Sequence, residues 1–140
     1  MARSTLSHSF AMSLTRSVLL VDDDDAVRKG LSRMLRKDGF EVSTAQDGGE
    51  AMTLLQTRTF DLVVSDVNMP VLGGEGLLDL MKELELDIPL ILITGDPDSV
   101  DPLLLHLETD VQLLSKPRAA DQLSTAVDAL LAPQSVAELI

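Results

Sequence analysis

From residue 17 onward, short apolar runs alternate with stretches whose apolar residues recur at helical spacing. Within those stretches the apolar positions are three, four or seven residues apart, the period of an amphipathic helix. The runs are SVLLV (17–21), FEVSTA (40–45), DLVVSD (61–66), PLILIT (89–94) and VQLLS (111–115). The helical faces are marked by Val27, Leu31, Met34 and Leu35, by Leu77, Leu80, Met81 and Leu84, by Leu123, Val127, Leu130 and Leu131, and more weakly by Ala51, Leu54 and Leu55. The chain is therefore predicted to alternate strands and helices.

Residues at the ends of the predicted helices agree with this division. Gly39 follows the first helix, where a glycine commonly ends a helix, and Asp47 with Glu50 three residues later has the spacing of a capping box. Asp24 and Asp25 are expected to be N-terminal charges of the first helix, where the helix dipole favours them.

Five strand–helix units in succession predict a parallel sheet with helices on both faces, a doubly wound α/β domain. The runs VLLV, LVV and LILI are continuously apolar, as strands covered on both faces must be. FEVSTA alternates and VQLLS contains Gln112, so both are predicted to be edge strands. The expected strand order is 2-1-3-4-5.

The fourth helix is expected to be short and irregular. GDPDSVDP (95–102) contains two Asp-Pro pairs, and proline is tolerated in the first turn of a helix but not in its interior. This helix should therefore begin only near Pro102. The expected organisation is a disordered leader over 1–16, one domain over 17–131, and a tail or the start of a linker over 132–140.

The composition of the chain limits the classes of function that it can have. The 140 residues include 23 acidic and 11 basic side chains, a net charge of −12, which disfavours binding to nucleic acid or anionic membranes. No apolar run approaches the length of a membrane span. Without cysteine there is no disulfide or thiolate site, which fits a cytoplasmic protein.

Polar side chains follow the strands at the edge where a doubly wound sheet binds its ligands. Asp22 and Asp23 follow the first strand, Asp66 and Thr94 end the third and fourth, and Lys116 comes just after the fifth. Three carboxylates in one crevice would repel one another, and a bound Mg²⁺, or another small divalent cation such as Mn²⁺, would relieve this. Asp66 could then attack a phosphoryl group, with Lys116 and Thr94 contacting the phosphoryl oxygens.

The segments VLLVDDDD, DLVVSDVNMPVLGG, ILITG and LLSKP, in this order and spacing, resemble the receiver domain of two-component response regulators, from about Val18 to Leu131. The resemblance implies a flavodoxin-like (βα)5 fold and a phosphorylation-controlled signalling domain, not a metabolic enzyme. Asp66 would accept the phosphoryl group from the phosphohistidine of a histidine kinase or phosphotransfer protein.

Further roles are implied by the same resemblance. Mg²⁺ would be held by Asp23, Asp66 and the backbone carbonyl of Asn68, with Asp22 acting directly or through water. Thr94 would turn toward the phosphoryl group and Lys116 would pair with it. Gly95 would leave room for the phosphate, Asn68 and Asp96 would tune its hydrolysis, and the Lys116–Pro117 bond would be cis.

The chain also departs from the family. Leu113 stands where receivers usually carry a switch aromatic on the fifth strand, Arg118 replaces the aromatic after Lys-Pro, and Thr109-Asp110 replaces a Gly-Ala pair. The phosphorylation site does not need these residues, but the usual output mechanism does. A homodimer and an output domain after Ile140 remain open as ways to transmit the signal.

The sequence is also compatible, to different degrees, with three other functions. A receiver-fold scaffold or dimerisation domain that acts without phosphorylation is the main alternative, and the missing aromatic favours it. A flavin carrier on the same topology needs aromatic side chains to stack the ring, and this chain has no Trp or Tyr. A haloacid-dehalogenase phosphatase carries DxDxT on its first strand, whereas DDDDAV lacks the threonine.

Overall fold

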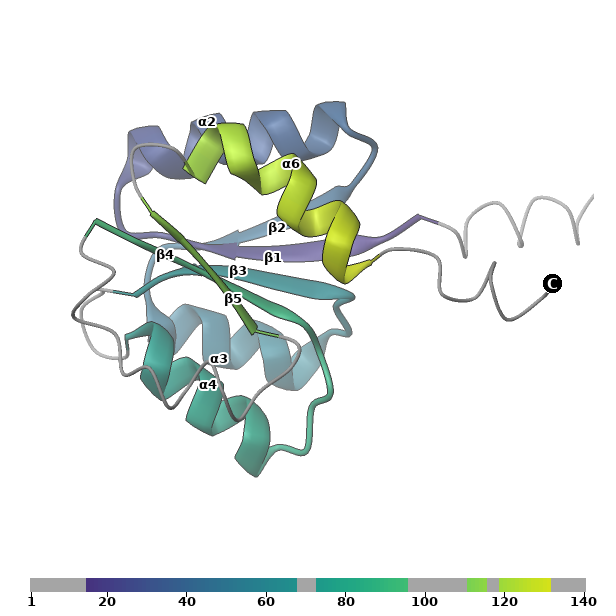
Figure 1. Cartoon of the computed structure of the whole chain (residues 1–140). Helices are drawn as coiled ribbons and strands as arrows, with labels where there is room; N and C mark the ends of the chain where they lie inside the picture. The colour runs from purple at the N-terminus through teal and green to yellow at the C-terminus, as the bar shows by residue number, and fades with distance from the viewer. Residues whose placement is uncertain (1–14, 68–72, 96–110, 116–118, 132–140) are drawn as a thin grey trace, which may run out of the picture.

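The computed structural model describes residues 15–67, 73–95, 111–115 and 119–131 (Figure 1). Five strands and four helices lie within these residues. In chain order they are β1 (Ser17–Val21), α2 (Asp25–Lys37), β2 (Glu41–Ala45), α3 (Gly48–Thr57), β3 (Leu62–Asp66), α4 (Gly74–Glu83), β4 (Leu90–Thr94), β5 (Val111–Ser115) and α6 (Ala119–Leu130). The expected short fourth helix falls in 96–110, outside the described residues.

The strands form one parallel sheet in the order β2-β1-β3-β4-β5, which confirms the predicted order. All five residues of β3 and all five of β4 are buried. Burial of the runs LVV and LILI is expected of strands covered on both faces, and the polar residues Ser65, Asp66 and Thr94 at the strand ends are buried with them. The edge strands β2 and β5 both contain partly exposed residues, including Gln112.

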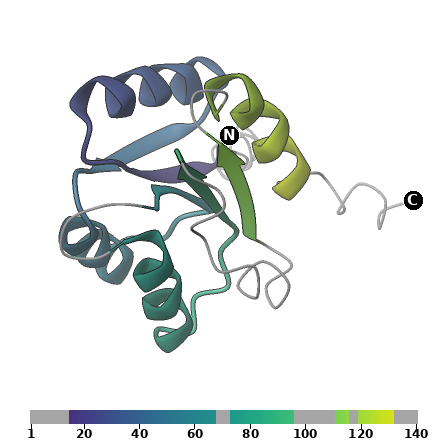
Figure 2. The same ribbon diagram turned by 60° about the vertical axis from the view of Figure 1, so that its left-hand side comes forward.

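Helices cover both faces of the sheet. Figures 1 and 2 agree in placing α2 and α6 on one face and α3 and α4 on the other. Successive residues of a strand point to opposite faces, so β1 sends Val18 and Leu20 to the first face and Leu19 and Val21 to the second. The domain therefore has two aliphatic cores separated by one sheet, and each core stabilises the central strands from its own side.

The first core packs α2 and α6 against the sheet. Its buried residues are Val18, Leu20, Leu31, Leu35, Val42, Leu62, Val64, Ile91, Ile93, Leu114, Leu123, Ala126 and Val127. The second core packs α3 and α4 against the other face. Its buried residues are Leu19, Val21, Ala45, Ala51, Leu55, Phe60, Val63, Leu77, Leu78, Met81, Leu90 and Leu92.

Local signals end the helices where the sequence predicts. The Asp24 carboxylate caps α2 by accepting hydrogen bonds from the amides of Ala26 (2.9 Å) and Val27 (3.1 Å). Asp47 caps α3 by accepting from the Glu50 amide at 2.8 Å. Gly39 follows α2 with φ of +97°, a backbone conformation that glycine adopts without strain. Among the described residues, no helix is both long enough and apolar enough to cross a bilayer.

Candidate functional site

Three aspartates meet at the carboxyl end of the sheet. One carboxylate oxygen from each of Asp22, Asp23 and Asp66 lies within 4.8 Å of those of the other two. Asp22 is 1% exposed and Asp66 is 6% exposed, whereas Asp23 is open to solvent. Asp22 and Asp66 therefore form the buried part of the cluster, and Asp23 forms its exposed part.

Strand register brings these residues together. The parallel pairing of β1 with β3 sets Val21 beside Ser65, so Asp22 and Asp66 come next on each strand. The Asp22 amide donates to the Ala45 carbonyl at 3.1 Å, which continues the β1–β2 ladder for one more step. The Asp22 carboxylate accepts from the Asp24 amide at 2.9 Å. The chain thus turns sharply from β1 into α2 while Asp22 stays in place.

Arg28 also holds this turn, and sequence reasoning gave it no role. Its Nη1 donates to the Asp22 backbone carbonyl at 2.8 Å, and its Nη2 pairs with the Asp25 carboxylate. Asp25 and Arg28 are three residues apart on one helix, so the ion pair itself could have been read from the sequence. The hydrogen bond to Asp22 could not, because it depends on where α2 lies relative to β1.

Thr94 and Gly95 lie at the end of β4. Asp66 pairs with Ile93 in the sheet, which places Thr94 one residue beyond it. Thr94 is fully buried. Among the described residues, no heavy atom lies within 4 Å of a Cβ added at Gly95. The backbone at Gly95 therefore borders open space, where sequence reasoning expected room for a phosphoryl group.

The backbone just after Asp66 also passes close to the start of α4. A Cβ at Gly73, the N-cap of α4, would lie 2.7 Å from the carbonyl oxygen of Val67. A side chain at this position would force the two segments apart. Sequence reasoning did not single out Gly73, although the Gly73-Gly74 pair at the start of α4 is a signal for a tight passage of the backbone.

Several predicted site residues lie outside the described residues. These are Asn68, Asp96, Lys116 and Pro117, together with Thr109, Asp110 and Arg118, where the sequence departs from the resemblance. Ser115 pairs with Thr94 at the end of β5, and Lys116 is the next residue in the chain. The roles expected of these residues remain predictions.

The chemistry of the cluster favours a hard cation. Carboxylates about 5 Å apart repel each other by up to about 4 kcal/mol at an effective dielectric of about 20, and by less at Asp23 because water screens it. A Mg²⁺ ion binds oxygen ligands at about 2.1 Å, so two of its ligands lie at most about 4.2 Å apart. Oxygens within 4.8 Å of one another need only a small adjustment to share such an ion.

Known proteins are similar to this chain in sequence and in fold. The family model for the response regulator receiver domain matches residues 18–128. The transcriptional regulatory protein PrrA of Mycobacterium tuberculosis is 39% identical over 115 residues, which is 81% of this chain and 49% of that protein. A probable transcriptional regulator, ycf27, of Cyanophora paradoxa is 38% identical over 117 residues, covering 83% of this chain and 48% of its own length. The chain spans about half the length of these relatives.

Solved structures of other receiver domains have the same fold. The chemotaxis response regulator CheY4 of Vibrio cholerae superposes with a TM-score of 0.73 at 30% identity, covering 84% of this chain and 99% of that one. The receiver domain of the Francisella response regulator 1452 superposes with a TM-score of 0.73 at 29% identity, covering 83% and 96%. The chain therefore belongs to the response regulator receiver domains, a family of signalling domains rather than classical enzymes.

Proposed function

We propose that this receiver domain accepts a phosphoryl group on Asp66 in a reaction that depends on Mg²⁺. The observation that carries the proposal is the meeting of the Asp22, Asp23 and Asp66 oxygens within 4.8 Å at the carboxyl edge of the sheet. This edge is where doubly wound folds bind their ligands. The donor would be the phosphohistidine of a histidine kinase or of a phosphotransfer protein.

Asp66 is the proposed acceptor because it ends a central strand, where it pairs with Ile93 of β4 and directly follows Ser65, the partner of Val21 in β1. One of its carboxylate oxygens would attack phosphorus in line with the bond to the histidine nitrogen. That bond breaks, its electron pair stays on the nitrogen, and an aspartyl phosphate forms. A preset position for the nucleophile lowers the entropic part of the barrier.

The donor set fits the proposed ion. Asp23 and Asp66 would bind it through carboxylate oxygens, Asn68 through its backbone carbonyl, and Asp22 directly or through a water molecule. When bound, Mg²⁺ would offset the negative charge of the carboxylates and of the incoming phosphoryl oxygens. Mn²⁺ would serve the same ligands.

Side chains beside the acceptor would hold the product. Thr94, one residue beyond the sheet partner of Asp66, would donate its hydroxyl to a phosphoryl oxygen, and Lys116 would pair with another. The open space at Gly95 supports a place for the phosphoryl group there. Asn68 and Asp96 would set how quickly water removes it.

The test is incubation with acetyl phosphate and Mg²⁺, followed by intact mass and gel filtration. Wild type should gain the mass of a single phosphoryl group and lose it again on standing. Asp66→Ala and Asp66→Asn should gain none, and chelation of the metal should prevent labelling of wild type. Asp25→Asn is the matched control, since Asp25 belongs to the same acidic run but not to the cluster. A persistent label on Asp66→Asn would place the acceptor elsewhere.

A scaffold role independent of phosphorylation is the second candidate, and Leu113 favours it. Leu113 is half-buried on β5 and packs against the second core. An aliphatic side chain there cannot act as the aromatic switch that receivers usually carry. Titration with beryllofluoride and Mg²⁺ separates the two functions. A change in spectrum or in oligomeric state supports signalling by phosphorylation, and no change supports the scaffold.

Downstream partners follow from the proposal. PrrA and ycf27 are about twice the length of this match, and their names describe regulators of transcription. An output domain joined after Ile140, or a homodimer formed on phosphorylation, would pass the signal on. Gel filtration of the phosphorylated protein, in the experiment above, tests the dimer.

A further inference from the structure

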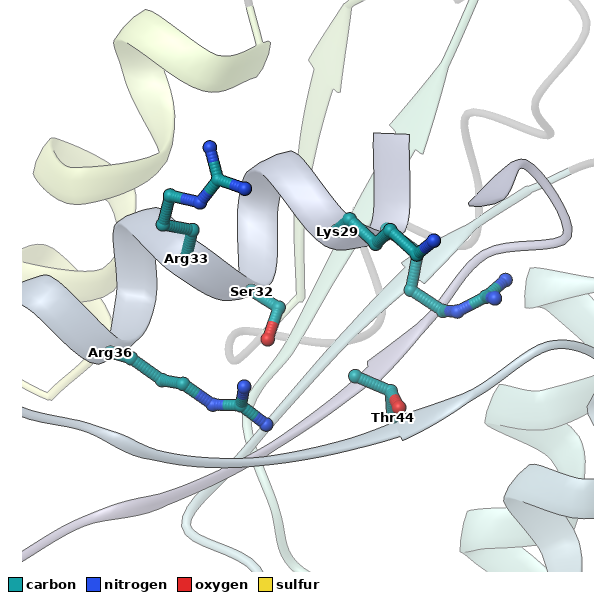
Figure 3. A pocket seen from close by; sticks show the side chains of 6 residues that line it. Lys29, Ser32, Arg33, Arg36 and Thr44 are labelled. Atoms are coloured by element: carbon teal, nitrogen blue, oxygen red, sulfur yellow. The ribbon is translucent and has the colours of Figure 1, made fainter. Parts of the chain in front are cut away.

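A pocket of about 430 Å³ lies beside α2 at the β2 edge of the sheet (Figure 3). Its volume lies within the range of small-molecule sites. It is separate from the carboxylates of the aspartate cluster, none of which lines it. The lining residues are Arg28, Lys29, Ser32, Arg33, Arg36 and Thr44.

The lining is cationic in a strongly acidic protein. Four of the 11 basic residues of the chain line this one pocket, while the whole chain carries a net charge of −12. None of the lining residues that the structure describes is acidic. Arg28 is paired with the Asp25 carboxylate, so the positive charge of the pocket rests mainly on Lys29, Arg33 and Arg36.

Two of the guanidinium groups are held by backbone carbonyls. Arg28 donates to the carbonyl of Asp22 at 2.8 Å, and Arg36 donates through Nη2 to the carbonyl of Val42 at 3.2 Å. Each guanidinium has five N–H donors, so hydrogen-bonding capacity remains on both. Arg36 in particular is held near strand β2 before any ligand arrives, which reduces the entropy lost on binding.

A buried hydroxyl gives an independent indication of a ligand. Ser32 is 4% exposed, and within the described part of the chain its Oγ is a buried side-chain atom without a hydrogen-bond partner. Buried polar groups nearly always have one, and leaving one unpaired is costly. Figure 3 shows this oxygen turned toward the space between α2 and β2, with the Arg36 guanidinium and the Thr44 side chain beside the same space.

We propose that this pocket binds a small oxyanion with more than one negative charge, of the phosphate class. The Ser32 hydroxyl would donate to one oxygen and Arg36 to others, while Lys29 and Arg33 add positive charge at the rim. Charged hydrogen bonds from guanidinium groups to phosphate are strong and directional. The acidity of the remaining surface disfavours a long polyanion such as nucleic acid and favours a compact ligand.

The test measures binding of inorganic diphosphate to the whole chain by calorimetry, with a chelator present. Wild type should bind one equivalent. Arg36→Gln should weaken the affinity by roughly tenfold or more, the effect of losing a hydrogen bond from a charged group. Lys37→Gln should bind as wild type does. Both residues are basic and in the last turn of α2, but only Arg36 lines the pocket.

Ser32→Ala separates ligand contact from a role in folding. Removing a buried hydroxyl that has no partner should leave the stability of the free protein unchanged or raised, while the affinity for diphosphate falls several-fold. Asp66→Asn should bind diphosphate at least as tightly as wild type does. This last variant separates the pocket from the proposed phosphorylation site, so that either proposal can fail alone.

The proposal would be overturned by no saturable binding of diphosphate, by equal losses of affinity in Arg36→Gln and Lys37→Gln, or by unchanged affinity in Ser32→Ala. Comparing the affinities of the pocket for tripolyphosphate, ATP and adenosine shows which kind of molecule carries the oxyanion. Equal affinity for tripolyphosphate and ATP indicates recognition of the phosphate chain alone, and tighter binding of ATP indicates a nucleotide. Binding of polyglutamate in place of diphosphate would indicate an acidic protein partner and contradict the proposal.

Discussion

Arg28 donates from Nη1 to the backbone carbonyl of Asp22 at a distance of 2.8 Å, which joins the first turn of α2 to the end of β1. The carbonyl belongs to one of the buried carboxylate residues of the aspartate cluster. Arg28 therefore holds the backbone of Asp22, and through it helps to place the Asp22 carboxylate in the cluster.

Replacing Arg28 with alanine should lower the free energy of unfolding by about 1–2 kcal/mol, because the Asp22 carbonyl loses a charged donor. Urea denaturation without divalent metal measures the change. Lys29→Ala is the control, since it removes the same charge from the next position of α2. Equal losses in the two variants would mean that charge, and not this hydrogen bond, matters.

Replacing Asp24 with alanine should cost about 1 kcal/mol of stability, because two amides at the start of α2 lose their acceptor. Asp24→Ser should restore most of the loss, since serine is an equally good N-cap. Thermal unfolding followed by circular dichroism distinguishes the two variants. If serine fails to restore stability, the contribution of Asp24 comes from its charge.

Adding Mg²⁺ should stabilise the folded protein, because the ion relieves repulsion among three carboxylates that meet only in the native state. At one hundred times the dissociation constant the gain is about 2.7 kcal/mol. Melting temperatures with and without Mg²⁺ measure it. Asp23→Asn should show a much smaller shift, whereas Asp25→Asn should respond as wild type does. A similar shift in all three proteins would indicate binding outside the cluster.

Gly73→Ala should destabilise the domain, because the new Cβ would lie 2.7 Å from the Val67 carbonyl and one of the two segments would have to move. The expected loss is about 1–3 kcal/mol, typical of overpacking. Gly30→Ala is the contrast. Its Cβ meets nothing within 4 Å in the interior of α2, so stability should rise by up to about 1 kcal/mol.

Gly95→Ala should fold as well as wild type, since a Cβ there meets no atom within 4 Å. The same methyl group would occupy space that the proposed phosphoryl group needs, so the rate of labelling by acetyl phosphate should fall. Intact mass over time measures the rate, and a melting curve checks the fold. An unchanged rate in a folded variant would remove Gly95 from the proposed site.

Much of the fold could be predicted because each central strand is a continuous apolar run. The predicted bounds of β1 and β5 match the structure, and the others differ by one residue at the start. At β2 the difference has a clear cause. The Phe40 amide donates to the Leu35 carbonyl at 3.1 Å, so Phe40 completes the C-terminal end of α2 before the strand begins. The spacing of apolar residues does not reveal this hydrogen bond at the end of α2.

The convergence of the three aspartates could also be predicted, because the topology determines which strand ends are neighbours. The contact of Arg28 with the Asp22 carbonyl could not, and neither could the unpaired hydroxyl of Ser32. Both depend on how far α2 lies from the sheet and on the direction in which its residues face. Sequence spacing fixes the face of a helix but not its distance from a neighbouring backbone.

Burial of all five residues of β3, and of all five of β4, has a consequence for how the domain can change state. Asp66 is anchored in the least deformable part of the molecule, where displacement of one strand would open both cores together. The backbone of Asp66 should keep its position when the carboxylate is modified. Any rearrangement that a partner senses must then come from the periphery of the domain, and hydrogen exchange at the amides of β3 should remain slow in every signalling state.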